Sequence, residues 1–235
     1  MIELLHTDCM SYMAGLPDKA FDLAIVDPPY GIGSWRGGQK SGNTISLAQV
    51  EKINNWDRYA PDAEYFNELR RVSVNQVVWG GNYFLDHLGN ALHVVIWNKM
   101  IRGMHLSDGE LAWTSFAGSA MRVFDMHRSQ CDTHGADRIH PTQKPVALYR
   151  WLLKNYAKPG QRILDTHLGS GSIAIACDIE GYDLVGCEID ADYIAGARKR
   201  LADHQAQPRL FDMPRPTVEQ LTLDTDAPSK DAEAA

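Results

Sequence analysis

The sequence has no apolar run that approaches the roughly 20 residues needed by a membrane-spanning helix. Its first ten residues, MIELLHTDCM, include neither a basic region nor a long apolar stretch, so we expect no signal peptide. The four cysteines contain no C-x-x-C pair: they are Cys9, Cys131, Cys177 and Cys187. Disulfide and zinc frameworks are therefore poorly supported, and we expect a cytoplasmic protein without a metal or a membrane contact.

The charge of the chain is also uneven. A formal net charge of −7 argues at first against nucleic acid as a partner. However, seven acidic and three basic residues lie between Asp203 and the last residue, whereas residues 115–160 contain seven basic and three acidic ones. The chain is thus locally basic where a polyanion could dock. A solvated surface with chance clustering of charges would look the same.

The tetrapeptide Asp27-Pro28-Pro29-Tyr30 follows an apolar run, FDLAIV, whose composition fits a strand buried on both faces. Neither proline has a backbone N–H, so the strand must end there. An acidic and an aromatic side chain are left at the carboxyl end of a buried strand, where open α/β sheets bind ligands. Asp27 and the Pro28 carbonyl could accept hydrogens from an amine, and Tyr30 could stack on a flat base. An ordinary Asp-Pro turn is the alternative.

A second signal is a nucleotide-binding βαβ pattern near the carboxyl end. Residues 162–166 predict a strand, Gly169-Ser170-Gly171-Ser172 a turn, 173–179 a helix and 183–187 a second strand. Glu188 then stands seventeen residues beyond Gly171, where its carboxylate could take two ribose hydroxyls. The third glycine of the dinucleotide fingerprint is missing, which disfavours NAD and a dehydrogenase. A plain glycine turn would also explain the pattern.

At 235 residues, 44% of them hydrophobic, the chain predicts one α/β domain with small additions. We expect a catalytic domain over 1–204 and a disordered acidic tail over 205–235. Within the domain, 31–43 is glycine-rich and a candidate lid, and 115–139 is the most irregular stretch. Further strands are expected at 2–6, 76–79, 93–97 and 110–114, and further helices at 10–15, 61–72, 145–156 and 191–204.

Together these motifs resemble the DNA amino-methyltransferases that use S-adenosylmethionine, specifically their β group. In that group the catalytic tetrapeptide precedes the cofactor-binding region. Here Asp27 to Tyr30 comes first, HPTQKP at 140–145 follows, and DTHLGSGS at 165–172 comes last. Smaller matches are Thr7-Asp8-Cys9, Asn55-Trp56-Asp57 and GGNYF at 80–84, so the resemblance covers roughly residues 1–204. It implies a doubly wound, mostly parallel, Rossmann-like sheet with permuted motif order.

The resemblance also implies an activity: methyl transfer from S-adenosylmethionine to the N6 amine of adenine in double-stranded DNA, after base flipping. Asp27 would contact the amine and lie near the methionine part of the cofactor. The other implied cofactor contacts are Asp8 and Cys9 at the adenine end, Glu188 at the ribose, Thr142, Gln143 and Lys144 around the carboxylate, and the turn formed by Asp165, Gly169, Ser170, Gly171 and Ser172. One departure is Thr166-His167, where the family usually has Pro-Phe.

The candidate DNA-recognition region is the basic stretch 115–139, with Arg122, His127, Arg128 and Arg138. Several alternatives remain open. N4-cytosine methylation uses the same chemistry, although that group more often has Ser at the position of Asp27. RNA could replace DNA, and the chain could be an inactive cofactor-binding regulatory module.

Two further partners are conceivable from the sequence. Recognition could be completed by a second subunit, which would make the protein a homodimer. In the tail, Gln207 to Phe211 reads Q-x-x-L-F and resembles the short peptide that binds the bacterial sliding clamp. Docking of Leu210 and Phe211 on the enzyme itself or across a dimer is the simpler explanation.

Overall fold

The computed structural model describes residues 1–32, 57–103, 107–127, 139–140 and 142–207. Several sequence-based expectations therefore lie outside the described residues. They are most of the candidate lid at 31–43, the pair Asn55-Trp56, the arginines Arg128 and Arg138, and the tail with the clamp-like peptide from Pro208 onward.

Within this part of the chain, eight strands form one sheet in the order β1-β8-β7-β2-β3-β5-β4-β6. β5 runs antiparallel to both of its neighbours, and all other neighbouring pairs are parallel. This confirms the mostly parallel sheet expected from the sequence. The strands are β1 Ile2–His6, β2 Phe21–Val26, β3 Ser73–Trp79, β4 His93–Asn98, β5 Gly109–Thr114, β6 Ala120–Asp125, β7 Arg162–Asp165 and β8 Asp183–Glu188.

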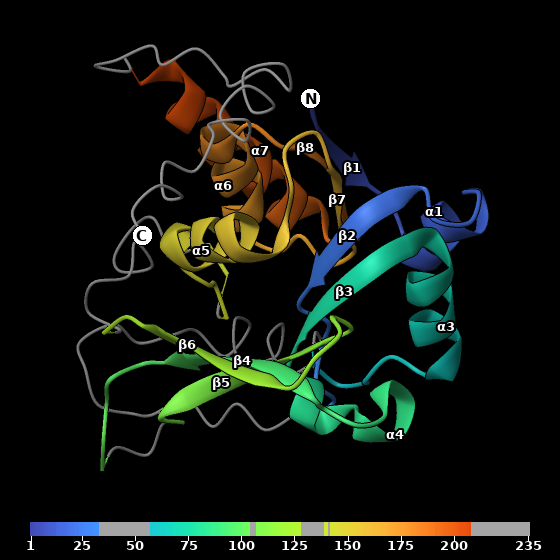
Figure 1. Cartoon of the computed structure of the whole chain (residues 1–235). Coiled ribbons are helices and arrows are strands. Elements are labelled where there is room, and N and C mark those ends of the chain that lie inside the picture. The colour runs from blue at the N-terminus through green and yellow to red at the C-terminus, as the bar shows by residue number, and fades with distance from the viewer. Residues whose placement is uncertain (33–56, 104–106, 128–138, 141, 208–235) are drawn as a thin grey trace, which may run out of the picture.

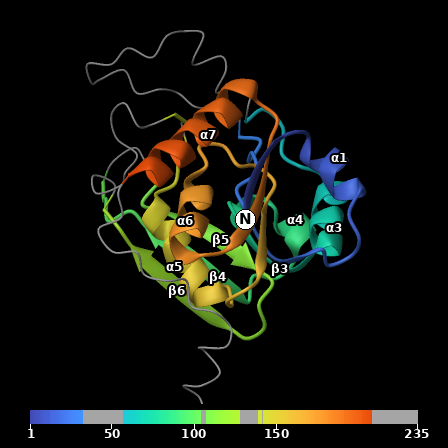
Figure 2. The ribbon, with the colours of Figure 1, turned by 90° about the horizontal axis from the view of Figure 1, so that it is seen from above.

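Helices cover both faces of the sheet (Figures 1 and 2). One face carries α5 (Val146–Tyr156), α6 (Ser172–Glu180) and α7 (Ala191–Ala206). The other carries α1 (Cys9–Ala14), α3 (Ala63–Val72), the 3₁₀ turn η1 (Gly81–Tyr83) and α4 (Leu85–Leu88). The chain thus has the doubly wound architecture, and no helix in its described part is long and apolar enough to cross a membrane.

Two apolar cores explain why β2 reads as a continuous hydrophobic run. Leu23 and Ile25 pack into the core under α5, α6 and α7, whereas Phe21, Ala24 and Val26 pack into the core under α1 and α3. All five side chains are at most 1% exposed. A strand buried on both faces needs apolar residues at successive positions, because alternate side chains point to opposite faces.

The site is positioned by the place where the winding of the sheet reverses. From β7 the chain passes through α6 to β8 on one side, and from β2 it passes through α3 to β3 on the other. β7 and β2 are neighbours, so the segments that follow their carboxyl ends diverge and leave a crevice. Ligands of open α/β sheets bind in such crevices.

Residues 115–139 differ from our expectation of an irregular insert. Residues 120–125 form β6, which pairs in parallel with β4 at the edge of the sheet. β6 buries little of its surface, since Met121 is 69% and Val123 49% exposed. Only Phe124 of this edge strand packs on the core, against Trp151, while Met121 and Val123 are apolar but exposed, so AMRVFD has no clean apolar alternation. The candidate recognition region therefore begins with an ordered strand of the sheet.

Candidate active site

A cavity of about 700 Å³ opens at the carboxyl ends of β1, β8, β7 and β2. Its size falls in the range of cofactor-binding clefts. The cavity is lined by four strand-end segments together with residues before and within α5: Thr7, Asp8, Cys9, Asp27, Pro29, His140, Thr142, Gln143, Lys144, Tyr149, Thr166, His167, Leu168, Gly169, Ser170, Glu188, Ile189, Asp190 and Tyr193.

At one end of the cavity, backbone amides hold the carboxylate of Glu188. Its Oε2 accepts from the Gly169 N–H at 2.8 Å and its Oε1 accepts from the Asp190 N–H at 2.9 Å. Gly169 adopts φ 51°, a left-handed conformation that glycine tolerates well. Burial raises the pKa of Glu188, and the backbone hydrogen bonds oppose that shift. A carboxylate has about four lone-pair sites, so Glu188 can also accept from a ligand hydroxyl.

The neighbouring segment, Thr7-Asp8-Cys9, forms the start of α1. Asp8 caps this helix, because its Oδ1 accepts from the Ser11 N–H at 2.8 Å and from the Ser11 hydroxyl at 2.9 Å. Burial, aided by the charge of Asp8, raises the pKa of the Cys9 thiol to about 12. Cys9 is therefore a neutral thiol and supplies no nucleophile.

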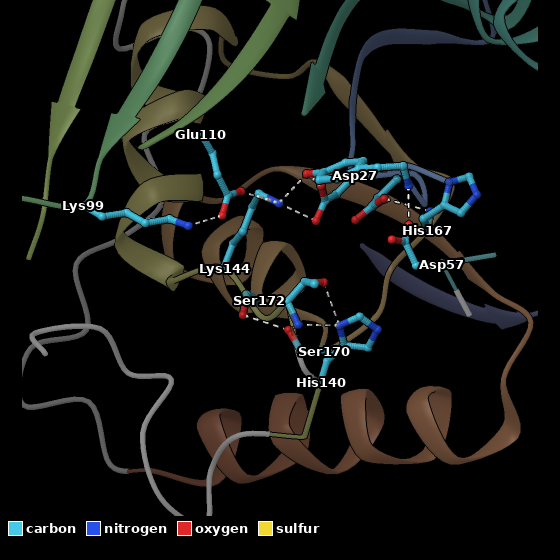
Figure 3. Close-up of polar contacts among 12 residues, drawn as sticks. Asp27, Asp57, Lys99, Glu110, His140, Lys144, His167, Ser170 and Ser172 are labelled. Atoms are coloured by element: carbon cyan, nitrogen blue, oxygen red, sulfur yellow. Dashed lines mark hydrogen bonds and ion pairs between the residues drawn. The ribbon is translucent and has the colours of Figure 1, made fainter. Parts of the chain in front are cut away.

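At the other end of the cavity, side chains hold the carboxylate of Asp27 (Figure 3). The Tyr30 hydroxyl donates to Oδ1 at 2.7 Å, and the Lys144 ammonium forms an ion pair with Oδ2. Burial raises the pKa of Asp27, while the charge of Lys144 lowers it. Asp57 fixes the following turn, because its Oδ1 accepts from the Tyr30 N–H at 2.6 Å and from the Gly31 N–H at 3.1 Å.

The Tyr30 ring, expected to stack on a base, already has an aromatic neighbour. It stacks on Tyr83 with ring centroids 4.9 Å apart and an interplanar angle of 19°, and it meets the edge of Phe84 at 6.1 Å. Gly80 lies against the ring with φ 67°, and a Cβ there would be 2.2 Å from Tyr30 Cε1. The GGNYF segment therefore packs against the Tyr30 ring and fixes its position.

Lys144 connects Asp27 to two residues that the sequence did not single out. Its Nζ lies 3.2 Å from Glu110 Oε2, and Glu110 Oε1 lies 2.6 Å from Lys99 Nζ (Figure 3). The charges of Lys144 and Lys99 lower the pKa of Glu110 to about 2, although burial opposes this shift. Glu110, Lys99 and Tyr30 line a second cavity of about 370 Å³.

The departure from the family pattern at Thr166-His167 forms its own hydrogen-bonded chain. The Tyr65 hydroxyl lies 2.7 Å from Thr166 Oγ1, which lies 2.9 Å from His167 Nδ1. Burial lowers the pKa of His167 to about 4. A neutral imidazole therefore lines the cavity at neutral pH, next to the segment of Asp8.

Ten of the predicted site residues line the larger cavity together: Asp8, Cys9, Asp27, Pro29, Thr142, Gln143, Lys144, Gly169, Ser170 and Glu188. Asp165, Gly171, Ser172 and Pro28 do not line it. Asp165 accepts from the His167 N–H at 3.0 Å, and burial raises its pKa to about 8. Gly171 packs against α7, where a Cβ would lie 2.8 Å from Ala197 Cβ. Asp165, Gly171 and Ser172 thus lie at the ends of the turn between β7 and α6, and Pro28 follows β2.

The structure places Arg122 and His127 away from the cavity. Arg122 is exposed in the middle of β6, four strands from β2, which corresponds to roughly 19 Å at about 4.8 Å per strand. His127 follows the carboxyl end of β6, at the same edge of the sheet as Asp27. In the described residues, no group of three His, Cys, Asp or Glu side chains is placed to hold a metal ion.

Comparisons with known proteins agree with this geometry. Residues 96–199 match the family model N6_N4_Mtase, described as DNA methylase. The chain is 25% identical over 215 residues to YubD of Escherichia coli (strain K12), covering 86% of this chain and 91% of YubD. It is 23% identical over 257 residues to the type II methyltransferase M.HinfI of Haemophilus influenzae, covering 89% of this chain and 71% of the relative.

Solved structures support the fold. The M1.HpyAVI–SAM complex matches with a TM-score of 0.54 at 20% identity, over 86% of this chain and 99% of that one. The cytosine-N4-specific PvuII DNA methyltransferase matches with a TM-score of 0.56 at 12% identity, over 86% and 90%. The fold matches that of class I S-adenosylmethionine-dependent DNA methyltransferases. Residues 96–199 thus match a DNA methylase family model, and the chain as a whole is similar to DNA methyltransferases.

Proposed function

We propose that this enzyme transfers a methyl group from S-adenosylmethionine to the N6 amine of adenine in double-stranded DNA. The observation that carries adenine is the carboxylate of Asp27 at the end of β2, in the wall of the cavity. Among relatives, the N4-cytosine group more often has a neutral Ser at that position. The PvuII enzyme shares the fold, so the architecture by itself does not distinguish the two bases.

The chemistry of the cavity fits the cofactor. Acidic side chains gather at one end, where Asp8, Glu188 and Asp190 can accept hydrogen bonds from an adenosine amine and from ribose hydroxyls. The other end offers the Asp27–Lys144 pair, which suits the amine and carboxylate of an amino acid. Thr142 and Gln143 also line the cavity. When bound, S-adenosylmethionine supplies an electrophilic methyl group on a sulfonium.

The chain's contribution to the reaction is to position a weak nucleophile. The lone pair of the target amine is delocalised into the base. Hydrogen bonds from that amine to Asp27 and to the Pro28 carbonyl would favour a pyramidal nitrogen and expose its lone pair. Asp27 need not be a strong base, because the amine proton becomes acidic only as the new bond forms. Such positioning can supply about 7–11 kcal/mol of the barrier reduction.

The target base must leave the duplex to reach the cavity, at a cost of a few kcal/mol. Base stacking on Tyr30 would offset about 1–3 kcal/mol of that cost. Since Tyr83 covers the Tyr30 ring at 4.9 Å, the base would use the remaining aromatic surface or displace Tyr83. In this proposal the residues that contact DNA are Arg122, His127, Arg128 and Arg138. A second subunit of a homodimer completes the recognition of the DNA sequence. The enzyme acts in the cytoplasm.

The direct test is modification-sensitive sequencing of plasmid DNA from cells that express the protein. We expect N6-methyladenine at one short sequence, and no modification in cells that express the Asp27→Ala variant. N4-methylcytosine at a defined sequence would refute the adenine assignment while leaving the methyltransferase class intact. Modified RNA with unmodified DNA would refute the DNA substrate.

A further inference from the structure

We propose that Glu110 is a positioning residue for methyl transfer: it takes the Lys144 ammonium away from Asp27 when the target amine binds there. The inference rests on the proposed function, because it requires an amine at Asp27. It concerns a residue on β5 and a second cavity, neither of which belongs to the motifs that predicted the site.

Both oxygens of Asp27 are engaged in the structure. Tyr30 donates to Oδ1 at 2.7 Å, and Lys144 is paired with Oδ2. Lys144 Nζ also lies 3.5 Å from the Tyr30 hydroxyl, so the ammonium stands beside both groups that the target base would contact. A target amine that approaches Asp27 therefore competes with Lys144 for the same carboxylate.

Lys144 cannot simply turn into solvent. Its side chain is 1% exposed, and Nζ lies 5.3 Å from the centre of the buried Trp79 ring. A buried ammonium without a partner costs several kcal/mol, so the charge must keep an acceptor. Besides the cofactor carboxylate, Glu110 can serve as this acceptor, because its Oε2 already lies 3.2 Å from Nζ. A small movement of Lys144 would exchange one ion-pair partner for the other.

Glu110 is prepared to receive this charge. Lys99 holds its other oxygen at 2.6 Å, and Lys99 Nζ lies 5.1 Å from the centre of the Trp97 ring. Asp27, Lys144, Glu110 and Lys99 thus alternate in sign along one row (Figure 3). Lys144 can shift within the row and keep a carboxylate partner, while Asp27 accepts from the Tyr30 hydroxyl and the target amine in place of the ammonium.

The row also separates the two cavities. Asp27 and Lys144 line the larger cavity, whereas Glu110, Lys99 and Tyr30 line the smaller one. A base that enters from the smaller cavity would meet Glu110 and Tyr30 before Asp27. The transfer of Lys144 to Glu110 would then link the arrival of the base to the release of the Asp27 carboxylate.

The test compares Glu110→Gln with the wild type in steady-state transfer of tritiated methyl groups to plasmid DNA that contains the sequenced site. We expect kcat to fall by about 10- to 150-fold, the loss of one hydrogen bond to a charged group. The dissociation constant for S-adenosylmethionine, measured by calorimetry, should stay within about threefold of the wild type. Glu110→Asp, which keeps the charge, should recover part of the rate.

A double variant separates positioning from charge balance. Lys99→Gln with Glu110→Gln restores neutrality around the Asp27–Lys144 pair but provides no carboxylate for Lys144. We expect this enzyme to remain slow. Glu68→Gln is the matched control, because it breaks an ion pair with Arg71 at 2.8 Å on α3, outside both cavities. Its kcat should be unchanged.

Three results would overturn the inference: a Glu110→Gln kcat within threefold of the wild type, recovery of the wild-type rate in the double variant, or a loss confined to cofactor affinity. If the wild-type product is N4-methylcytosine, the adenine assignment fails separately. The role of Glu110 is then decided by the same rates, because either amine would bind at Asp27.

Discussion

Glu188 and Asp27 are two carboxylates in the wall of one cavity, and they are held in different ways. Backbone N–H groups of Gly169 and Asp190 fix Glu188, so its position is set by the course of the chain. Side chains of Tyr30 and Lys144 hold Asp27, and both side chains have rotatable bonds. A carboxylate held by backbone suits a permanent binding contact. A carboxylate held by exchangeable side chains suits a step in which partners change.

Among the changes that test this comparison, replacement of Asp27 should have the largest effect on the rate of methyl transfer. We expect Asp27→Ala to lower kcat on the order of 100- to 1000-fold, because the amine loses its charged acceptor. Cofactor binding should be weaker but measurable by calorimetry, since Asp8 and Glu188 remain in the cavity wall. Near-normal transfer of tritiated methyl groups would show that Asp27 does not contact the target amine.

Glu188→Ala should act on binding instead. It removes the acceptor of the proposed ribose hydroxyls, and we expect the affinity for S-adenosylmethionine to fall by about 1–3 kcal/mol. The kcat at saturating cofactor should change much less than in Asp27→Ala. Glu188→Gln keeps the size of the side chain but only one acceptor oxygen, so one of the Gly169 and Asp190 amides loses its partner and an intermediate affinity is expected. An unchanged affinity in both variants would remove Glu188 from the cofactor site.

Tyr30→Phe should have a smaller effect, because it deletes one hydrogen bond to Asp27 and keeps the aromatic ring. The lost hydrogen bond is one to a charged group, and because Lys144 still pairs with Asp27 we expect a rate reduction at the lower end of the range for such bonds, about tenfold. Tyr30→Ala should lose most activity, because it also removes the ring that stacks on Tyr83. Equal rates of the two variants would argue against any role of the ring in base stacking.

The smallest effect is expected for His167→Phe, which restores the residue usual in the family. Burial lowers the pKa of His167 from its ordinary 6.5 to about 4, so the unfolded chain takes up a proton before the folded chain does. His167 therefore costs stability as pH falls from about 6.5 toward 4. Between pH 7.5 and 5, Tm should fall less in His167→Phe than in the wild type. An equal decrease in Tm in the two proteins would show that His167 does not contribute to the loss of stability at low pH.

The sequence predicted the half of the sheet formed by β1, β8, β7 and β2 well. Its strands are buried on both faces and its turns contain glycine, proline or an acidic residue at the strand end, so local patterns reveal them. Glu188 is an example. Its position is set by the turn that follows β7 and by the strand β8, and the sequence pattern predicts both.

The half formed by β3, β5, β4 and β6 was harder to predict. β6 is exposed on the edge and gave no alternation. Glu110 in β5 and Lys99, directly after β4, lie eleven positions apart, and the antiparallel pairing of β4 with β5 brings them together beside the partner of Lys144. From the sequence alone, a buried Glu near the start of a strand cannot be distinguished from a solvent-exposed Glu at the same position. Charge partners made by sheet pairing leave no local signal.

The pairing of β1 with β8 has a consequence for synthesis on the ribosome. Ile2 faces Leu184 and His6 faces Glu188 in this pair, so the first strand of the described residues pairs with the last one described. At about 5–20 residues per second, roughly ten to forty seconds of translation separate them. During that time the nascent chain carries β1 without its partner. Chaperone binding or early collapse on α1 would have to protect this segment until β8 emerges.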